Sequence, residues 1–248
     1  MSSDRVLSYH VAVMPKPKRA ATEGFEGFAD RDGKFFRALA RNQRRDWFDA
    51  HKKEYEAGWL TPMKTLLADV RERIDGLFAR HPLAEPKVFR IYRDVRFSKD
   101  KSPYKTHIGG YVAIAGSTPG PSGVAVPYVH VGADEIFIAA GQYMMDPPQL
   151  ARFREAVLDD ECGGAVTAIV KKLERAGFTV GSHDALQRVP RGIDPEHPRA
   201  ALLKRKGLIV SYPDLPRKLL VEPGLVDWIV TQTKRVVPLV EWLASLGE

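Results

Sequence analysis

The sequence predicts an α+β fold: a single domain in which an antiparallel or mixed sheet of about five strands is flanked by N- and C-terminal helices. This prediction rests on changes in the spacing of apolar residues along the chain. Apolar residues recur every three or four positions up to about residue 80, alternate with other residues between 88 and 143, and return to helical spacing after residue 146. Helices grouped before and after a run of strands are typical of α+β domains. A chain of 248 residues fits one domain, which we place at 24–248 after a loose basic tail at 1–23.

Three helices are expected before residue 82. The first follows Gly33 and carries apolar residues as far as Leu39, and the second surrounds Trp47. Thr61 and Pro62 mark the start of the third, because threonine is a favoured N-cap and proline is favoured in the first helical turn. The N-terminal third is therefore predicted to be helical.

The middle of the chain predicts strands. Branched and aromatic residues alternate with other residues in four segments, at 88–97, 111–115, 126–131 and 135–143. The turn residues between the last two segments predict a hairpin. A fifth strand is expected at 208–212.

Helical spacing returns in the last third. Asp146 followed by proline predicts a capped helix, a second helix is expected at 165–176, and a closing helix at 225–243 with a kink at Pro238. The segment 188–199 is rich in proline and glycine and is predicted to be a structured turn.

The composition excludes some kinds of protein and of site. Hydrophobic residues make up 44% of the chain and charged residues 28%, as in ordinary globular proteins. Cys162 is the only cysteine, so an internal disulfide and a zinc site of several thiolates are excluded. No apolar run approaches the roughly 18 residues that cross a bilayer, and residues 1–24 lack the apolar core of a secretory signal. We expect a cytoplasmic protein without a membrane partner.

A dense basic segment at 89–107 is the strongest functional signal. The net charge of the chain is +7, which favours anionic partners, and this segment reads FRIYRDVRFSKDKSPYKTH. If 88–97 is a strand, one face is apolar except for Arg93, which should then be buried in a structural ion pair. The other face carries Arg90 and Arg96, and the loop that follows adds lysines. Arginine and lysine groups beside tyrosine hydroxyls can hold phosphate or carboxylate oxygens.

From this pattern we expect a pocket for an anionic small molecule. Its anion-binding residues are predicted to be Arg90, Arg96, Lys101, Tyr104 and Lys105. The alternative is a basic strand and loop whose charges serve only solubility and ion pairs.

Catalytic roles are assigned less directly. His107 could move a proton near neutral pH, and folding could bring it together with His130 and Asp94. The alternative for each histidine is a structural role. The chain has no phosphate-binding loop, dinucleotide fingerprint, nucleophile elbow or helical histidine pair, and we expect neither a metal nor a cofactor.

The basic segment also resembles a known family. The run at 89–105 is similar to the signature of the proteins catalogued as domain of unknown function 2461. Segments at 42–48, 141–147 and 188–198 resemble other parts of that family, and the resemblance extends over about residues 25–245. It implies a single domain and no known activity.

Three functions therefore stay open at this stage. The first is a domain, with or without enzymatic activity, that binds a phosphate- or carboxylate-bearing small molecule. The second is nucleic-acid binding, which the net charge and the tyrosines Tyr92 and Tyr104 among basic residues favour. The third is a structural or partner-binding domain without catalysis. The oligomeric state cannot be read from the sequence.

Overall fold

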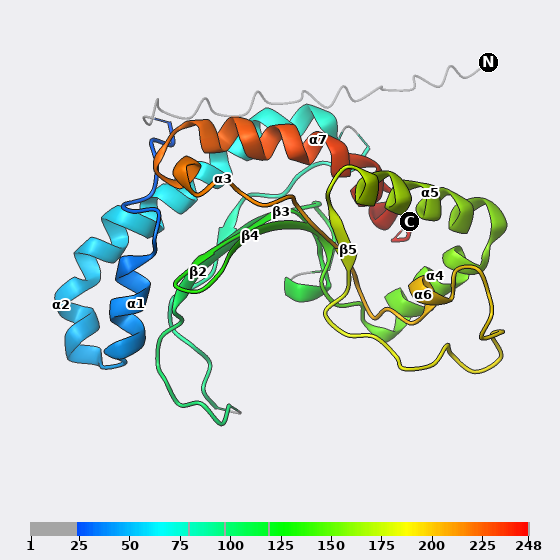
Figure 1. Cartoon of the computed structure of the whole chain (residues 1–248), viewed down its shortest axis with the longest axis horizontal. Helices are drawn as coiled ribbons and strands as arrows, with labels where there is room; N and C mark the ends of the chain where they lie inside the picture. The colour runs from blue at the N-terminus through cyan, green and yellow to red at the C-terminus, as the bar shows by residue number, and fades with distance from the viewer. Residues whose placement is uncertain (1–23, 79, 97, 119, 248) are drawn as a thin grey trace, which may run out of the picture.

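A computed structural model describes residues 24–78, 80–96, 98–118 and 120–247 (Figure 1). The basic tail predicted at 1–23 lies outside the described residues. The α+β class is confirmed: one antiparallel sheet of six strands carries helices before, beside and after it. The strand order is β1-β2-β3-β4-β6-β5. Within the described residues, no helix combines the length and the apolar character needed to cross a membrane.

The elements follow one another as the periodicity predicts, with one additional strand. The helices are α1 (Lys34–Arg41), α2 (Arg45–Tyr55), the π-helix η1 (Glu56–Leu60), α3 (Thr61–Ile74), η2 (Asp75–Leu77), η3 (Gly120–Ser122), α4 (Pro147–Leu158), α5 (Asp160–Arg175), α6 (Ala200–Leu203), η4 (Arg217–Val221) and α7 (Gly224–Ser245). The strands are β1 (Lys87–Val88), β2 (His107–Ala113), β3 (Val124–Gly132), β4 (Ile136–Gln142), β5 (Thr179–Gly181) and β6 (Leu208–Ser211).

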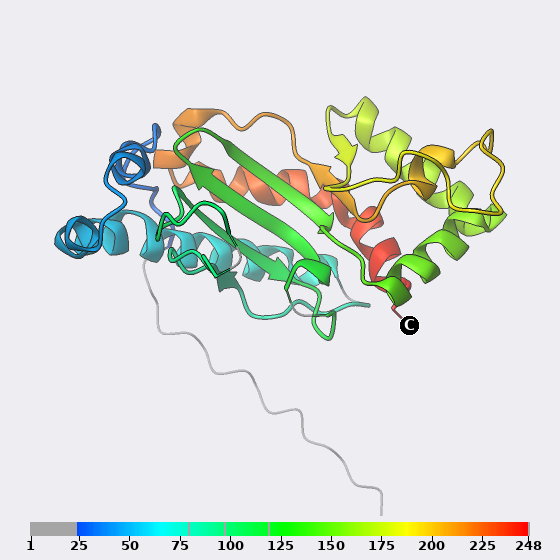
Figure 2. The ribbon, with the colours of Figure 1, turned by 90° about the horizontal axis from the view of Figure 1, so that it is seen from below.

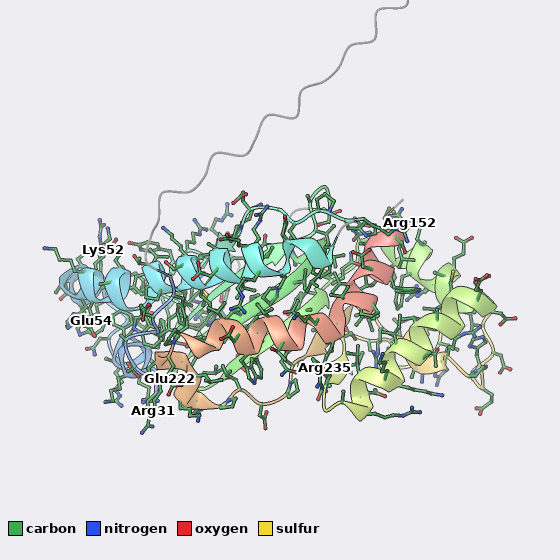
Figure 3. All side chains as sticks on the ribbon, turned by 90° about the horizontal axis from the view of Figure 1, so that it is seen from above. Arg31, Lys52, Glu54, Arg152, Glu222 and Arg235 are labelled. Carbon is green, nitrogen blue, oxygen red and sulfur yellow. The ribbon has the colours of Figure 1, made fainter. Side chains whose placement is uncertain are left out.

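Helices α3 and α7 cover one face of the sheet, which we call the covered face (Figures 1 and 3). The strands present alternate apolar residues to these helices: Val129, Val131, Ile138, Leu208 and Val210 are each at most 2% exposed. Burying a side chain of this size stabilises the fold by about 1.5–3 kcal/mol. The core of the domain therefore lies between these two helices and the sheet.

Glycine at position 110 allows one of these helices to come close to the sheet. A Cβ atom at Gly110 would lie 2.6 Å from Leu67 Cδ1 of α3 and 2.9 Å from the carbonyl oxygen of Lys87. No real Cβ atom tolerates such contacts, so a larger residue would push α3 or β1 away from β2.

Two features predicted from the sequence are found in helices α4 and α7. The Asp146 side chain accepts a hydrogen bond from the backbone N–H of Gln149, and the Gln149 side-chain oxygen accepts one from the backbone N–H of Asp146, which forms a capping box. Pro238 lies inside α7, whose axis changes direction toward its C-terminal end (Figure 3).

The prediction of a strand at 88–97 is wrong. Regular pairing ends at Val88, and from Ile91 onward the chain bonds to its own returning arm instead of to β2. Arg93 N–H donates to the carbonyl of Pro103 (2.9 Å) and Lys105 N–H donates to that of Ile91 (2.8 Å). We call residues 89–105 the basic ribbon; it projects away from the sheet in Figure 1.

The burial predicted for the apolar residues of 88–97 depended on the strand, and it is correct for only some of them. Ile91 is buried as expected, but Phe89 is 41% exposed and Val95 is only half-buried. Phe97 lies outside the described residues. The strand predicted at 111–115 begins earlier, at His107, which brings that histidine into the sheet.

Candidate functional site

Among the described residues, no α-helix covers the second face of the sheet, which we call the open face; the short helix η3 lies against it (Figure 2). A cleft of about 550 Å³ lies on it, bordered by the basic ribbon at one end and by the segment after β4 at the other. The strand register sets aromatic and histidine residues side by side there. Its principal residues are Phe89, His107 and Tyr111, then Tyr128 and His130 of β3, Phe137 of β4, Tyr143 after β4, and Ser211 of β6.

Small residues between the aromatic rings make the cleft hollow. Gly109 lies opposite His130, and Ala139 lies between Tyr128 and Ser211. A Cβ atom at Gly109 would lie 3.0 Å from the Tyr128 hydroxyl, so the absence of a side chain there makes room for that hydroxyl group. The cleft is therefore a consequence of residue size along the open face.

Aromatic rings form a continuous wall in the cleft. The Phe89 ring centroid lies 5.5 Å from that of Tyr111 and 6.3 Å from that of Tyr128, and Tyr128 lies 5.7 Å from Phe137. The His130 ring stacks on Phe137 at 4.7 Å. Such a wall offers a flat apolar ligand several faces and edges to pack against.

Two histidines meet at the end of the cleft nearest the basic ribbon. The ring centroids of His107 and His130 are 4.2 Å apart. The Tyr128 hydroxyl lies 3.1 Å from His130 Nδ1, and Glu135 Oε1 lies 3.5 Å from His130 Nε2. The side chain of His130 is therefore oriented from both of its ring nitrogens.

Burial keeps this histidine pair neutral. It lowers the pKa of His130 to about 4. The pKa of His107 is also lowered to about 4, first by burial and then by the proximity of His130 and Lys105. Burial, with Glu135 and Tyr143 nearby, raises the pKa of Tyr128 to about 12. At neutral pH the site thus presents neutral hydrogen-bonding groups and two imidazoles that can each accept a proton.

A second tyrosine–histidine pair lies at the opposite end. The Tyr143 hydroxyl and His183 Nδ1 are 2.6 Å apart, and their rings stack at 4.4 Å. Asp184, next to His183, is held by Lys206 at 2.6 Å. This pair was not predicted from the sequence, because 40 residues separate its members and the sheet order β4-β6-β5 brings them together.

Lys105 provides a positive charge at the ribbon end of the cleft. Its Nζ lies 5.1 Å from the centroid of the Phe89 ring, in a cation–π contact. Partial burial and the positive charge of Arg90 lower the pKa of Lys105. A smaller hollow of about 350 Å³, lined by Arg93, Asp94, Lys105, Thr106 and His107, shares His107 with the cleft.

The five residues predicted to bind an anion are not all brought together. Arg96 is 76% exposed and is bound to Asp94 through two hydrogen bonds of 2.9 and 2.7 Å. Lys101 Nζ donates to the carbonyl of Val95 at 2.9 Å. Because the strand face that was to align Arg90 with Arg96 does not exist, these two residues lie on different parts of the ribbon.

Tyr104 and Arg90 lie in two other parts of the structure. The Tyr104 ring is 2% exposed and stacks on Phe48 at 4.5 Å, so its ring belongs to the core. Arg90 lines a groove of about 530 Å³ beside α2 and α3, which shares Phe89 with the cleft. Of the five, Arg90 and Lys105 are therefore the two whose charges act on one another.

Arg93 forms an ion pair with Asp100 within the ribbon. Its side chain is 32% exposed, so it is less buried than the alternating pattern implied. Hydrogen bonds from Ser102 and from Arg93 lower the pKa of Asp100 to about 2. The pair stabilises the ribbon locally and leaves Arg93 at the rim of the smaller hollow.

Of the three residues predicted to come together, His107, His130 and Asp94, the structure brings only two into contact. The two histidines are adjacent, but the carboxylate of Asp94 is bound to Arg96. Across residues 24–78, 80–96, 98–118 and 120–247, no three side chains of His, Cys, Asp or Glu are arranged to hold a metal ion.

Comparison with known proteins adds a family. The model of the family described as Conserved hypothetical protein (DUF2461) matches residues 33–242, which is most of the chain. No curated protein matches this sequence. The matched range includes the whole sheet, the basic ribbon and both ends of the cleft. The chain therefore belongs to the family of conserved hypothetical proteins with domain of unknown function 2461.

Proposed function

We propose that the open face of the sheet binds a small molecule that has a flat aromatic part and a phosphate or carboxylate group. The observation that carries this proposal is the position of Lys105, a partly buried cation that lies over the Phe89 ring and lines the smaller hollow adjoining a cleft walled by aromatic rings. A cleft of about 550 Å³ falls in the size range of small-molecule sites.

The charges of the basic ribbon support binding of an anion at this end. Arg93 and Arg96 are compensated by Asp100 and Asp94. Neither Arg90 nor Lys105 forms an ion pair with a described residue. Two neighbouring cations without a carboxylate partner lower their mutual repulsion when an anion binds between or beside them.

The polar groups in the cleft support a role in acid–base chemistry. His107 and His130 are neutral and adjacent, and Tyr128 keeps its proton. A bound ligand would meet both proton acceptors and a proton donor, as general acid–base catalysis requires. We propose binding as the primary function, with proton transfer as the chemistry that the site would perform if the ligand is a substrate. We place the protein in the cytoplasm, in keeping with its single cysteine.

Two other functions make different predictions. Tyr92 is 46% exposed on the ribbon, and together with the ribbon's lysines it favours nucleic-acid binding. A purely structural or partner-binding role would leave the cleft without a ligand, and the paired Arg93 and Arg96 agree with it. Salt dependence and ligand size separate these functions.

Calorimetric titration with phenyl phosphate, benzoate and phenol tests the proposal. Both anions are expected to bind the wild type, and Lys105→Ala should weaken their binding about tenfold or more, since a charge-assisted contact contributes about 1.5–3 kcal/mol. Phenol binding should change little. Lys99→Ala, which removes an exposed lysine of the same ribbon, is the matched control and should bind like the wild type.

Two results would count against the proposal. Equal affinities of wild type and a folded Lys105→Ala for both anions would contradict the role of Lys105. Absence of binding to all three compounds, with tight and steeply salt-dependent binding to a DNA oligonucleotide, would favour the nucleic-acid function instead.

A further inference from the structure

Lys105 stands beside more positive charge than a single carboxylate could balance. It lines the smaller hollow, and Arg90 acts on it from the adjoining groove beside α2 and α3. Neither residue forms an ion pair with a described residue, whereas the charges of Arg93 and Arg96 are balanced by Asp100 and Asp94. A carboxylate carries one negative charge, while a phosphate monoester carries about 1.5 to 2 near pH 7.

We infer that the ligand of the open face is an aromatic phosphate monoester, recognised as a dianion by Lys105 and the His107–His130 pair, with Arg90 adding positive charge from the adjoining groove. This inference rests on the proposed function and narrows it from phosphate or carboxylate to phosphate.

The shape of the ribbon end favours a group with several acceptor oxygens. The smaller hollow beside the cleft brings Lys105, the Thr106 residue, Arg93 and His107 around one space of about 350 Å³. These residues can donate from several directions, which suits the three terminal oxygens of a phosphate better than the planar pair of a carboxylate. His107 lies at the junction with the cleft, so the phosphate and the aromatic part would occupy adjoining spaces.

Asp94 also lines this hollow, and its negative charge would oppose an anion if it were unpaired. Arg96 binds it through two side-chain hydrogen bonds and lowers its pKa, so the pair is neutral as a whole. The opposing charge of Asp94 is thus screened by Arg96, which gives the Arg96–Asp94 pair a supporting role in the site.

The histidine pair adds a positive charge only when it is needed. His107 faces His130, Lys105, Arg93 and Glu135, and apart from Glu135 these neighbours and its burial oppose protonation in the empty cleft. A bound dianion reverses that balance, because an adjacent negative charge favours the imidazolium form. Binding of the dianion should therefore be accompanied by proton uptake, and it should strengthen as the pH falls from 8 toward 6 for as long as the ligand stays a dianion.

Phenyl phosphate and phenyl sulfate provide the decisive comparison. The two esters have nearly the same shape, but at pH 7.5 the sulfate carries one negative charge and the phosphate close to two. Calorimetry should show phenyl phosphate binding about tenfold tighter or more, because the additional charge lies beside uncompensated cations in a partly buried site. Titrations in two buffers with different enthalpies of ionisation should show proton uptake for the phosphate.

Variants separate the contributions. Lys105→Ala and His107→Asn should each reduce the preference for phosphate over sulfate several-fold, and His107→Asn should also reduce the proton uptake. Lys99→Ala should leave both unchanged. Equal affinity of the wild type for the two esters would overturn the inference of a dianionic ligand and leave the proposed anion site standing. Failure of both esters, and of benzoate, to bind more tightly than phenol would overturn the proposed function as well.

Discussion

The covered and open faces of the sheet are built from the same strands, yet they differ in composition. In β3, Val129 and Val131 are 1% exposed and pack toward the helices, while Tyr128 and His130, which alternate with them, lie on the open face. In β4, Ile138 and Phe137 show the same division. An open face of an antiparallel sheet usually carries polar residues that water can solvate. Here it carries aromatic rings and neutral histidines, and our proposal of a ligand site rests on this difference.

The largest difference between the faces should appear in stability. Ile138→Ala is expected to lower the free energy of unfolding by about 2–5 kcal/mol, because it leaves a cavity beneath α7. Phe137→Ala, its neighbour on the open face, should cost clearly less, since that ring is only partly buried, and it should weaken binding of phenyl phosphate. Urea denaturation of both variants measures the difference. Equal losses of stability would show that the open face is part of the core.

The open face should also make stability depend on pH. In the unfolded chain His107 and His130 have pKa values near 6.5, whereas in the folded protein both values are about 4. Between these values the unfolded state binds more protons, so stability is fully present above pH 6.5 and is lost as the pH falls toward 4. The loss should be on the order of 3 kcal/mol for each of the two histidines.

Urea denaturation between pH 4 and 8 tests this dependence. A double variant His107→Gln, His130→Gln should show a flatter profile over the same range, whereas His183→Gln, in the exposed pair at the other end of the cleft, is the control that should keep the wild-type profile. Identical profiles for the wild type and the double variant would contradict the neutral state of the pair.

Gly109 and Gly110 are neighbours in β2 on opposite faces of the sheet, so substitutions at these two positions compare the faces directly. Gly110→Ala should destabilise the fold by about 1–3 kcal/mol, because its Cβ would meet Leu67 and the Lys87 carbonyl. Gly109→Ala places a methyl group 3.0 Å from the Tyr128 hydroxyl and should lower ligand affinity more than stability. Thermal unfolding and calorimetry on both variants give the two numbers. If Gly109→Ala were the more destabilising of the two, the open face would be the more tightly packed one.

The smallest effect is expected in the basic ribbon. Arg96→Ala removes an exposed ion pair and should leave the melting temperature unchanged within error. It should weaken phenyl phosphate binding less than Lys105→Ala does, because it acts only by leaving the charge of Asp94 without its partner. A larger loss of affinity for Arg96→Ala than for Lys105→Ala would show that the ribbon itself holds the anion.

The sequence allowed the class of the fold and most elements to be predicted, because these depend on local periodicity. The capping box at Asp146 is an example. The N-cap predicted at Thr61 is wrong, because α2, η1 and α3 follow one another without a break and Thr61 itself has helical backbone angles. The strand at 88–97 was predicted wrongly for the same reason: alternation reports which side chains could share a face, but not whether another strand is present to pair with. From Ile91 onward the partner is the returning arm of the ribbon, through the pairing of Tyr92 with Tyr104.

The candidate site could be predicted only in part. Lys105, His107 and His130 could be singled out as candidate site residues from the sequence, and the alternation of Tyr128 with His130 marked one face of a strand. Nothing local showed that this face has no covering helix, since α3 and α7 come from opposite ends of the chain and both pack on the other side. The Tyr143–His183 pair likewise depends on the order of strands.

One measurement tests most directly whether the open face is the binding site. In a titration of isotopically labelled protein with phenyl phosphate, followed by NMR, the amide shifts should be concentrated at Phe89, Lys105 and His107 and at the open-face residues of β3 and β4. Residues in the groove beside α2 and α3, such as Lys52 and Lys64, should shift little. Saturable shifts confined to that groove, or the absence of saturable shifts at the open face, would contradict the account.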